Sequence, residues 1–187
     1  MITLEGTVKK FTGDGSTTSF SHNLKHTDFI VFVDEVQNDD VTKDELGITF
    51  SSAPSSGAVI ELKRYVQLFP EKYEKYKTSV GAPTETRDDG IIEPNWEHQR
   101  GALLNYFLMA WEMATDDEVK PLWDMLAYAP TTSDPMVLTW EDGTKYRVVF
   151  ADKAGEERCK FDESIIDEIS GTTYWKGTVA LIEIERL

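Results

Sequence analysis

The sequence predicts an α+β protein that is mostly β, in which a small antiparallel β domain precedes a larger β-sandwich or open barrel with one helix packed across it. Two features carry this prediction. Residues 106–113 are almost continuously apolar, as expected for a strand buried on both faces, and after Thr115 the apolar residues recur with the period of a helix. Most of the remaining chain consists of short apolar or alternating runs separated by turn residues, which is typical of antiparallel strands.

Length, charge and cysteine content narrow the class of protein. The 187 residues suffice for one large or two small packed domains. A net charge of −15 argues against binding through nucleic-acid phosphates or an anionic membrane surface, so we expect no specific nucleic acid and no membrane among the partners. Cys159 is the one cysteine, which excludes an intramolecular disulfide and favours synthesis in a reducing cytoplasm. We see neither a signal peptide nor a run of about 20 apolar residues.

Residues 1–66 form the predicted small β domain. Phe29–Val33, Ile48–Phe50 and Ala58–Tyr65 have the apolar or alternating pattern of short strands, and clusters rich in Gly, Asp, Asn, Pro and Ser separate them. No segment of this region has the period of a helix.

A series of turn and strand positions in this region follows a known order. It consists of Phe11, Gly13 to Thr18, Phe20, Val31 to Val33, Gln37, Thr49, Phe50, Pro54, Gly57 and Ile60. In this order the positions resemble a small β domain that recurs in tailed-phage virion proteins, especially at the start of tail-fibre and tail-spike chains. Glu35 stands where that pattern usually has a turn glycine. The resemblance implies a component of the virion.

Residues 67–95 form a predicted connector arm, because charged residues and tyrosines alternate there and prolines and glycines interrupt any sustained period. We expect a short helical or extended piece followed by a loop. Tyr73 and Tyr76 are candidate interface residues that dock either on the second domain or on a neighbouring subunit, and most connections stay local. Trp96 is a third candidate, because tryptophan carries much of the binding energy where subunits meet.

Residues 96–187 form the predicted larger domain, and its helix spans 116–128. Thr115 and Glu118 have the spacing of a capping box, in which the Thr hydroxyl accepts a hydrogen bond from a free amide and the Glu carboxylate reaches back. Pro121 lies inside the helix, so we expect an irregular first turn or a kink. The predicted apolar stripe consists of Val119, Leu122, Trp123 and Leu126.

A hairpin and a final strand are predicted to complete this domain. Residues 136–140 and 146–150 flank the pair Asp142–Gly143, which favours a type I′ turn with positive φ at both positions. Residues 153–170 are acidic and indicate a short helix or loop, and residues 175–184 form the closing strand. Core packing is the predicted role of Trp111, Trp123, Trp140 and Trp175.

A second series of positions runs through this domain. It consists of Glu97 to Arg100, Leu108 to Trp111, Thr115, Leu138 to Trp140, Lys145 to Arg147, Trp175 and Leu181 to Ile184. Their order resembles the minor tail proteins of lambda-like siphophages and, more distantly, tail-tube and distal-tail proteins. The resemblance implies a tail-tube-like fold. The loop between helix and hairpin lacks the Gly-Gly and Trp-Thr-Pro-Pro sequence typical of that family.

Neither a catalytic site nor a metal site is indicated. His22 and His26 are four residues apart but lack the Glu of an HExxH motif, and no nucleophile accompanies His98. We therefore expect no enzyme activity, no cofactor and no metal. None of the acidic pairs has the spacing of a calcium loop, and an acidic composition alone accounts for Asp39/Asp40, Asp88/Asp89, Asp116/Asp117, Glu156/Glu157 and Asp162/Glu163.

Together these features predict a structural protein of a tailed-phage virion, made in the host bacterial cytoplasm and located in the tail, its tip or the baseplate. Its expected partners are copies of itself in a homo-oligomeric ring, other phage tail proteins and, in one version, tail fibres. The acidic charge suits a lumen through which DNA slides. Two alternatives stay open: a host-attachment tail-fibre module whose β domain binds a receptor glycan, and a head–tail connector or tail-completion protein.

Overall fold

The computed structural model describes residues 1–78, 84–86, 92–94, 104–128, 130, 134–151, 159–167 and 172–186. Antiparallel strands with one helix make up the elements of this part of the chain, which confirms the α+β, mostly β class. The elements are β1 (Ile2–Thr12), β2 (Ser19–Ser21), β3 (Ile30–Val33), β4 (Val36–Gln37), β5 (Val41–Lys43), β6 (Gly47–Phe50), β7 (Val59–Leu68), β8 (Lys72–Thr78), β9 (Thr84–Thr86), β10 (Ile92–Pro94), β11 (Leu104–Ala114), α1 (Asp116–Tyr128), β12 (Met136–Thr139), β13 (Lys145–Phe150), β14 (Cys159–Ile166) and β15 (Thr173–Arg186).

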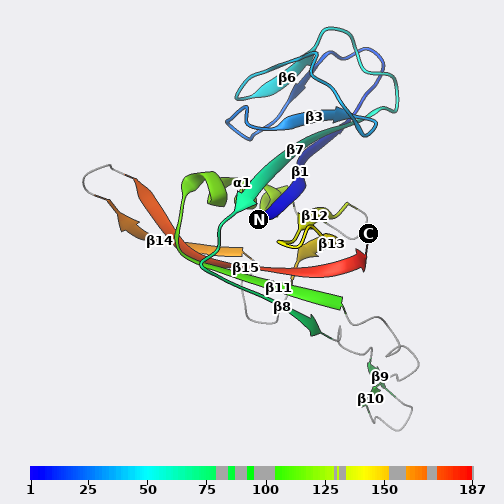
Figure 1. The fold of residues 1–187 in the computed structure, drawn as a ribbon. Coiled ribbons are helices and arrows are strands. Elements are labelled where there is room, and N and C mark those ends of the chain that lie inside the picture. The colour runs from blue at the N-terminus through cyan, green and yellow to red at the C-terminus, as the bar shows by residue number, and fades with distance from the viewer. Residues whose placement is uncertain are drawn as a thin grey trace.

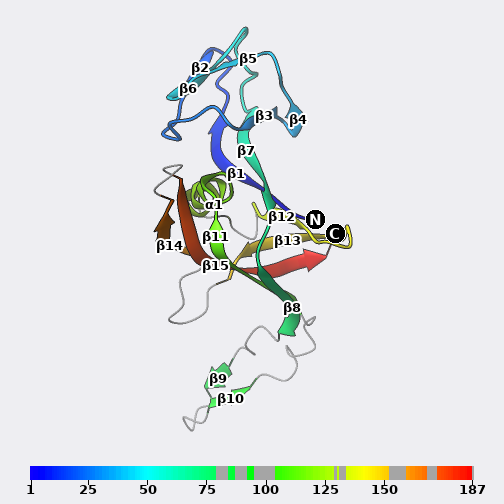
Figure 2. The ribbon, with the colours of Figure 1, turned by 60° about the vertical axis from the view of Figure 1, so that its left-hand side comes forward.

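One antiparallel sheet of ten strands organises the described part of the molecule (Figure 1). Its order is β4-β3-β7-β1-β12-β13-β15-β11-β8, and β14 pairs with the first half of β15, beyond the end of β13. Two smaller sheets are β2-β6-β5 and β9-β10. Figure 2 shows the β2 to β6 region at one end, the helix and most of the main sheet in the middle, and β9-β10 beyond β8 at the other end.

The N-terminal lobe, residues 11–59, grows out of the main sheet. β1 and β7 pair along almost their whole length, and their distal halves carry the lobe. The proximal part of β1, Thr3–Glu5, pairs with Val137–Thr139 of β12, so the sheet runs through both predicted domains, 1–66 and 96–187. The register of the β1–β7 ladder shifts at Val8, a β-bulge that bends the ribbon where it leaves the body.

Part of the predicted connector belongs to the sheet. Strand β7 continues through Val66 and Leu68, because these buried side chains keep the alternation of the strand. The connector was predicted to be either helical or extended at this point, and after Phe69 and a short bend it is extended. Strand β8 there pairs with β11 along Lys72–Thr78.

Helix α1 occupies the predicted residues 116–128 and packs against β1 and β7 on one side and β14 and β15 on the other. Trp123 and Leu126 are only partly buried, contrary to the predicted stripe, because the helix turns Met125 toward Gly6 of β1. A Cβ at Gly6 would lie 3.0 Å from the Met125 sulfur, so glycine permits this approach. The buried face consists of Glu118, Val119, Pro121, Leu122 and Met125.

Of the two predicted effects of Pro121, an irregular first turn or a kink, α1 has the irregular first turn, and the helix continues through the proline. The carbonyl of Thr115 accepts hydrogen bonds from the N–H groups of both Glu118 and Val119, each at 3.1 Å. A shared acceptor of this kind is common in the first turn of a helix. The irregularity therefore lies in the first turn, before the proline.

The carboxylate of Glu118 joins three segments at this end of the helix. One oxygen accepts hydrogen bonds from the indole N–H of Trp111 in β11 (3.0 Å) and from the backbone N–H of Phe69 (2.9 Å). The other accepts from the backbone N–H of Thr115 (3.2 Å), which is the reach-back half of the capping box. The Thr115 hydroxyl points to the same carboxylate, at 3.4 Å, instead of accepting from a helix amide as predicted.

One hairpin turn differs from the sequence expectation, and a second has positive φ at residues other than glycine. In the β12–β13 loop only Gly143 has positive φ (81°), and Trp140 pairs with Thr144, so a three-residue turn with a glycine bulge replaces the predicted type I′ turn. Between β3 and β4, Asp34 and Glu35 both have positive φ, 49° and 67°. This is the type I′ combination, reached here without glycine.

Residues Cys159–Ile166 form strand β14, and this corrects the short helix or loop predicted within 153–170. Cys159 and Phe161 are buried at two-residue spacing, so the segment has a strand period that its acidic residues concealed. Gly177 allows β15 to lie close by, since a Cβ there would be 2.1 Å from the carbonyl oxygen of Lys160.

Replacing Glu118 with Gln should lower the free energy of unfolding by about 2–3 kcal/mol, because an amide NH2 would face a buried donor where an oxygen now accepts. Asp117→Asn is the matched control in the same turn, and its exposed side chain should change stability by about 0.3 kcal/mol. Urea unfolding followed by tryptophan fluorescence measures both variants. Equal losses in the two would contradict the role of Glu118.

Glu35→Gly should raise the free energy of unfolding by about 0.5–1 kcal/mol, because positive φ strains a residue that carries a Cβ. Glu45→Gly is the control, since Glu45 is exposed and does not have positive φ. It should bring no gain. Thermal unfolding followed by circular dichroism compares the two, and a loss at Glu35 equal to that at Glu45 would refute the strain.

Candidate functional site

Tyr73, a predicted interface residue, contacts the β12–β13 hairpin of its own chain. Its hydroxyl donates a hydrogen bond to Glu141 (2.7 Å), and this carboxylate raises the pKa of Tyr73. Its ring meets Trp140 edge-on, with 5.6 Å between centroids. The backbone of Tyr76 pairs with β11, while its side chain and all of Trp96 lie outside the described part of the chain. Contact of these residues with a neighbouring subunit stays a prediction.

Lys75 reaches the same hairpin from β8. Its ammonium donates a hydrogen bond to the Tyr146 hydroxyl (3.1 Å) and lies 5.8 Å and 5.4 Å from the ring centroids of Trp140 and Tyr146. Phe107 packs against both rings. Since β8 and β13 are separated by β15 and β11 in the sheet, these contacts require the sheet to curl into an open barrel.

Strands β8 and β14 are the two unpaired edges of the curled half of the sheet, the series β14-β15-β11-β8 with β13 beside β15. Neither has a partner on its outer side among the described strands. Each step in the series β14-β15-β11-β8 is antiparallel, so the two edges run in opposite directions. An unpaired strand presents a row of backbone donors and acceptors that can pair with another chain.

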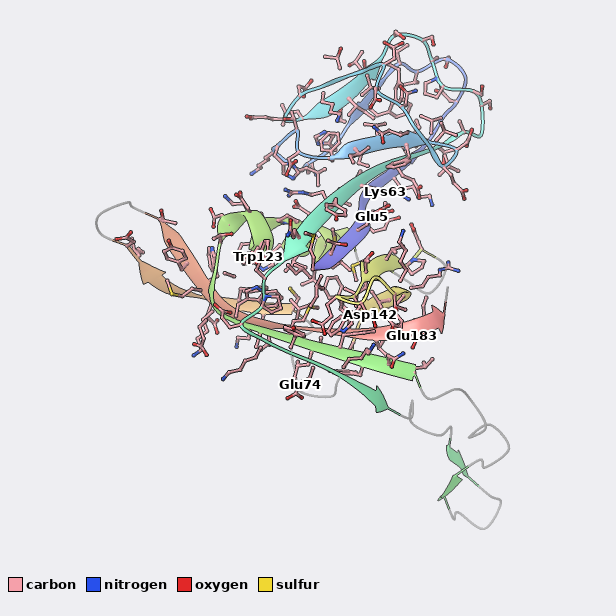
Figure 3. The ribbon with its side chains drawn as sticks, in the orientation of Figure 1. Glu5, Lys63, Glu74, Trp123, Asp142 and Glu183 are labelled. Atoms are coloured by element: carbon pink, nitrogen blue, oxygen red, sulfur yellow. The ribbon has the colours of Figure 1, made fainter. Side chains whose placement is uncertain are left out.

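The two open edges also carry both signs of charge on one face of the sheet. Cross-strand pairing places Lys72 and Glu74 of β8 on the same face as Lys160 and Asp162 of β14. This is the face opposite Phe107 and Met109, which are buried, and Figure 3 shows Glu74 projecting from it. Each edge thus offers a cation and an anion to a neighbouring strand.

A buried arginine connects the lobe to the helix. Arg64 of β7 donates hydrogen bonds to Asp124 of α1 (2.5 Å) and to Asp28 of the lobe (2.6 Å). The Nδ1 atom of His26 accepts the N–H of Asp28, so Nε2 carries the proton and donates to Asp124 (2.9 Å). Two carboxylates around one buried guanidinium offset the cost of its desolvation. His26 therefore has a positioning role at this junction.

His22 is buried within the lobe and stacks edge-on against Phe29, with 5.0 Å between ring centroids. Its Nδ1 atom faces the N–H of Leu24 at 3.4 Å, and Nε2 makes no hydrogen bond to a described residue. Burial lowers the pKa of His22, since a charged imidazolium would lose its hydration there. His98, the third histidine, lies outside the described residues.

The predicted acidic pairs do not converge on a cation site in the part of the chain that is described. No group of three or more His, Cys, Asp or Glu side chains there could hold a metal ion. Asp116 is occupied by Lys120 (2.6 Å) and by the indole N–H of Trp175 (2.7 Å), which together lower its pKa. Asp88/Asp89 and Glu156/Glu157 lie outside the described ranges.

Comparison with known proteins identifies no relative: no protein family, no curated protein and no solved structure matches this chain. Within the described ranges, no helix has the length and apolar character needed to cross a membrane.

Acidification should destabilise the protein through His22. The unfolded imidazole titrates near 6.5 and the folded one at lower pH, so as pH falls below 6.5 the unfolded chain takes up a proton first. The stabilisation is complete above that value and is lost below it. Asp44 and the backbone of Gly47 partly oppose this lowering of the pKa, whereas His26 and Lys9 reinforce it.

The test compares urea unfolding of the wild type and His22→Leu at pH values from about 7.5 to about 5. The variant should lose less stability than the wild type over this range. The same pH dependence in both proteins would assign the effect to other groups.

Proposed function

We propose that the chain is a structural component of a tailed-phage virion, a tail, tail-tip or baseplate protein that assembles with copies of itself into a ring. It acts through subunit contacts, without catalysis. The motif orders in both halves of the sequence support a virion protein. The observation that carries the ring is the pair of open sheet edges with opposite strand directions.

Opposite directions at the two edges have a geometric consequence. When β8 of one copy lies beside β14 of the next, the new pair is antiparallel, like every other pair in this sheet. All copies then have the same orientation, and the contact is heterologous. Heterologous contacts close into rings when the rotation between neighbours permits.

Charge supports the same pairing. Lys72 and Glu74 of β8 meet Lys160 and Asp162 of β14 on one face, so a suitable register places opposite charges across the junction. Cross-strand pairs of opposite charge contribute about 0.2–1 kcal/mol each, which selects register more than it supplies affinity. Backbone hydrogen bonds along the edge supply the rest.

The acidic residues are unevenly distributed over the chain. The face of the edge strands carries charges of both signs, whereas the N-terminal lobe, residues 11–59, contains eight acidic residues and only Lys25 and Lys43 as cations. The lobe accordingly holds a large share of the negative charge. We place the lobe at the outside of the ring, where it decorates the tail or anchors fibres, because it stands at the end of the molecule opposite β8 (Figures 1 and 2).

Cysteine cross-linking tests the ring. The double variant Glu74→Cys/Asp162→Cys should form an oxidised ladder of oligomers that ends at one closed size, since each copy links to two neighbours. Either single variant should form few cross-links, because a heterologous contact brings position 74 of one copy next to position 162 of another. Cys159 can stay, because burial raises the pKa of its thiol to about 12.

Glu74→Cys/Glu45→Cys is the matched control, since Glu45 is an exposed lobe residue. It should give no ladder. A ladder of equal length in this control, or none in the Glu74/Asp162 variant at high protein concentration, would contradict edge-to-edge assembly.

The virion assignment is tested separately by immunogold labelling of intact particles with an antibody raised against the whole chain. Label on the tail axis or tip is the expected result. Label at the neck would favour a head–tail connector, and label at fibre ends would favour host attachment. Detection in the infected cell but on no purified particle would overturn the assignment.

A further inference from the structure

A groove lies on the outward face of the main sheet, where the two halves of the chain meet. It has a volume of about 340 Å³ and is lined by Met1, Thr3, Glu5, Tyr65, Val137, Thr139 and Lys145. The strands β7, β1, β12 and β13 each contribute to it. Ligand sites occur preferentially at such junctions between parts of a protein.

The register of the four strands sets the chemistry of the groove. One cross-strand row runs from Tyr65 through Glu5 to Val137, and the next runs from Thr3 through Thr139 to Lys145. Side chains in cross-strand rows share one face of a sheet. An aromatic ring, a carboxylate, two hydroxyls and an ammonium therefore project from neighbouring positions of the same surface.

Tyr65 is the aromatic platform of the groove. Its side chain is 57% exposed, although neighbouring residues of β7 such as Arg64 and Val66 are buried. An exposed ring offers its flat apolar face to the C–H groups of a sugar, while its hydroxyl stays available for a hydrogen bond. Thr3, which is only 7% exposed, and the half-buried Thr139 line the groove with hydroxyls that can donate and accept.

The charges of the groove favour an anionic ligand. Glu5 lies 3.9 Å from the ammonium of Lys63, so its charge is partly compensated (Figure 3). Lys145 is exposed, and its ammonium has no hydrogen-bond or ion-pair partner among the described residues. An ammonium with no partner among the described residues, at one end of the groove, suits a carboxylate, and Glu5 remains an acceptor for ligand hydroxyls.

We propose that this groove binds a sugar ring that bears a carboxylate, as in a uronic acid. The ring lies on Tyr65, its carboxylate pairs with Lys145, and its hydroxyls face Glu5 and the two threonines. This site differs from the glycan groove expected within the N-terminal β domain alone, because both halves of the chain build it. It does not involve β8 or β14, so it is independent of the ring.

The experiment is an NMR titration of the ¹⁵N-labelled full chain with sodium glucuronate and with glucose, at matched ionic strength and up to about 50 mM sugar, since a ligand of this size is expected to bind with a Kd of about 1 mM. Glucuronate should shift the amides of Thr3, Tyr65 and Thr139 saturably and bind more tightly than glucose. The spectrum away from the groove reports whether each variant is folded.

Two variants separate the contribution of the Lys145 ammonium to sugar binding from that of the Tyr65 ring. Lys145→Gln should weaken glucuronate binding about fivefold and bring it to the level of glucose, the effect expected for a partly exposed ion pair. Tyr65→Ala should weaken both sugars at least about tenfold, because the stacking platform is lost. Lys25→Gln, an equal loss of charge on the lobe, should leave the preference for glucuronate unchanged.

The proposal is overturned if neither sugar shifts the groove amides at the highest concentration, or if wild-type protein binds glucose as well as glucuronate. Retention of the glucuronate preference in folded Lys145→Gln would likewise remove the assigned role of the ammonium.

Discussion

The arrangement of the sheet depends on two carboxylates, the buried Glu118 and the exposed Glu71, at the corner where β7, β11 and α1 meet. Glu118 supplies acceptors for the indole of Trp111 and for the amides of Phe69 and Thr115. At the same corner, Glu71 accepts the amides of Glu112 and Met113, where β11 departs from regular pairing with β15. Few other acceptors could serve amides at such a corner, because the strands that end there no longer offer carbonyls in register. The chain is thereby redirected from a central strand to the edge strand β8.

Because the chain is redirected to an edge strand, the curled half of the sheet does not close into a barrel. A closed barrel has no free edges, whereas this sheet stops at β8 and β14. The lysines and carboxylates on those edges keep an isolated copy from pairing indiscriminately. A register that places like charges opposite each other is disfavoured, and one that places unlike charges opposite each other is favoured. In the proposed ring, the same residues select the register of the neighbouring strand. Tyr73 and Lys75 hold β8 against the hairpin, so the edge is ordered within the single chain.

The sequence predicted an element correctly where a segment showed a single apolar period, either that of a helix or that of a strand. The helix 116–128 and the strands around 106–113 and 136–150 follow from apolar spacing and turn residues alone. Strand β14 was missed because Cys159 and Phe161 are its buried signal, and the acidic residues that follow them suggested a loop. Sheet order lies beyond local pattern altogether. Pairing of β1 with β12 joins residues more than a hundred positions apart, and the groove around Tyr65 and the junction at Arg64 both depend on such long-range contacts.

The shared ribbon of β1 and β7 has a mechanical consequence. The lobe is joined to the body by two long antiparallel strands, so a pull on the lobe along their direction stretches both backbones side by side. The load passes to the body through the β1–β12 ladder, whose interstrand hydrogen bonds are sheared together instead of opening one after another. The bulge at Val8 and the anchoring of Arg64 by Asp124 lie where bending would concentrate. A lobe attached in this way transmits tension to the body of the protein instead of yielding to it.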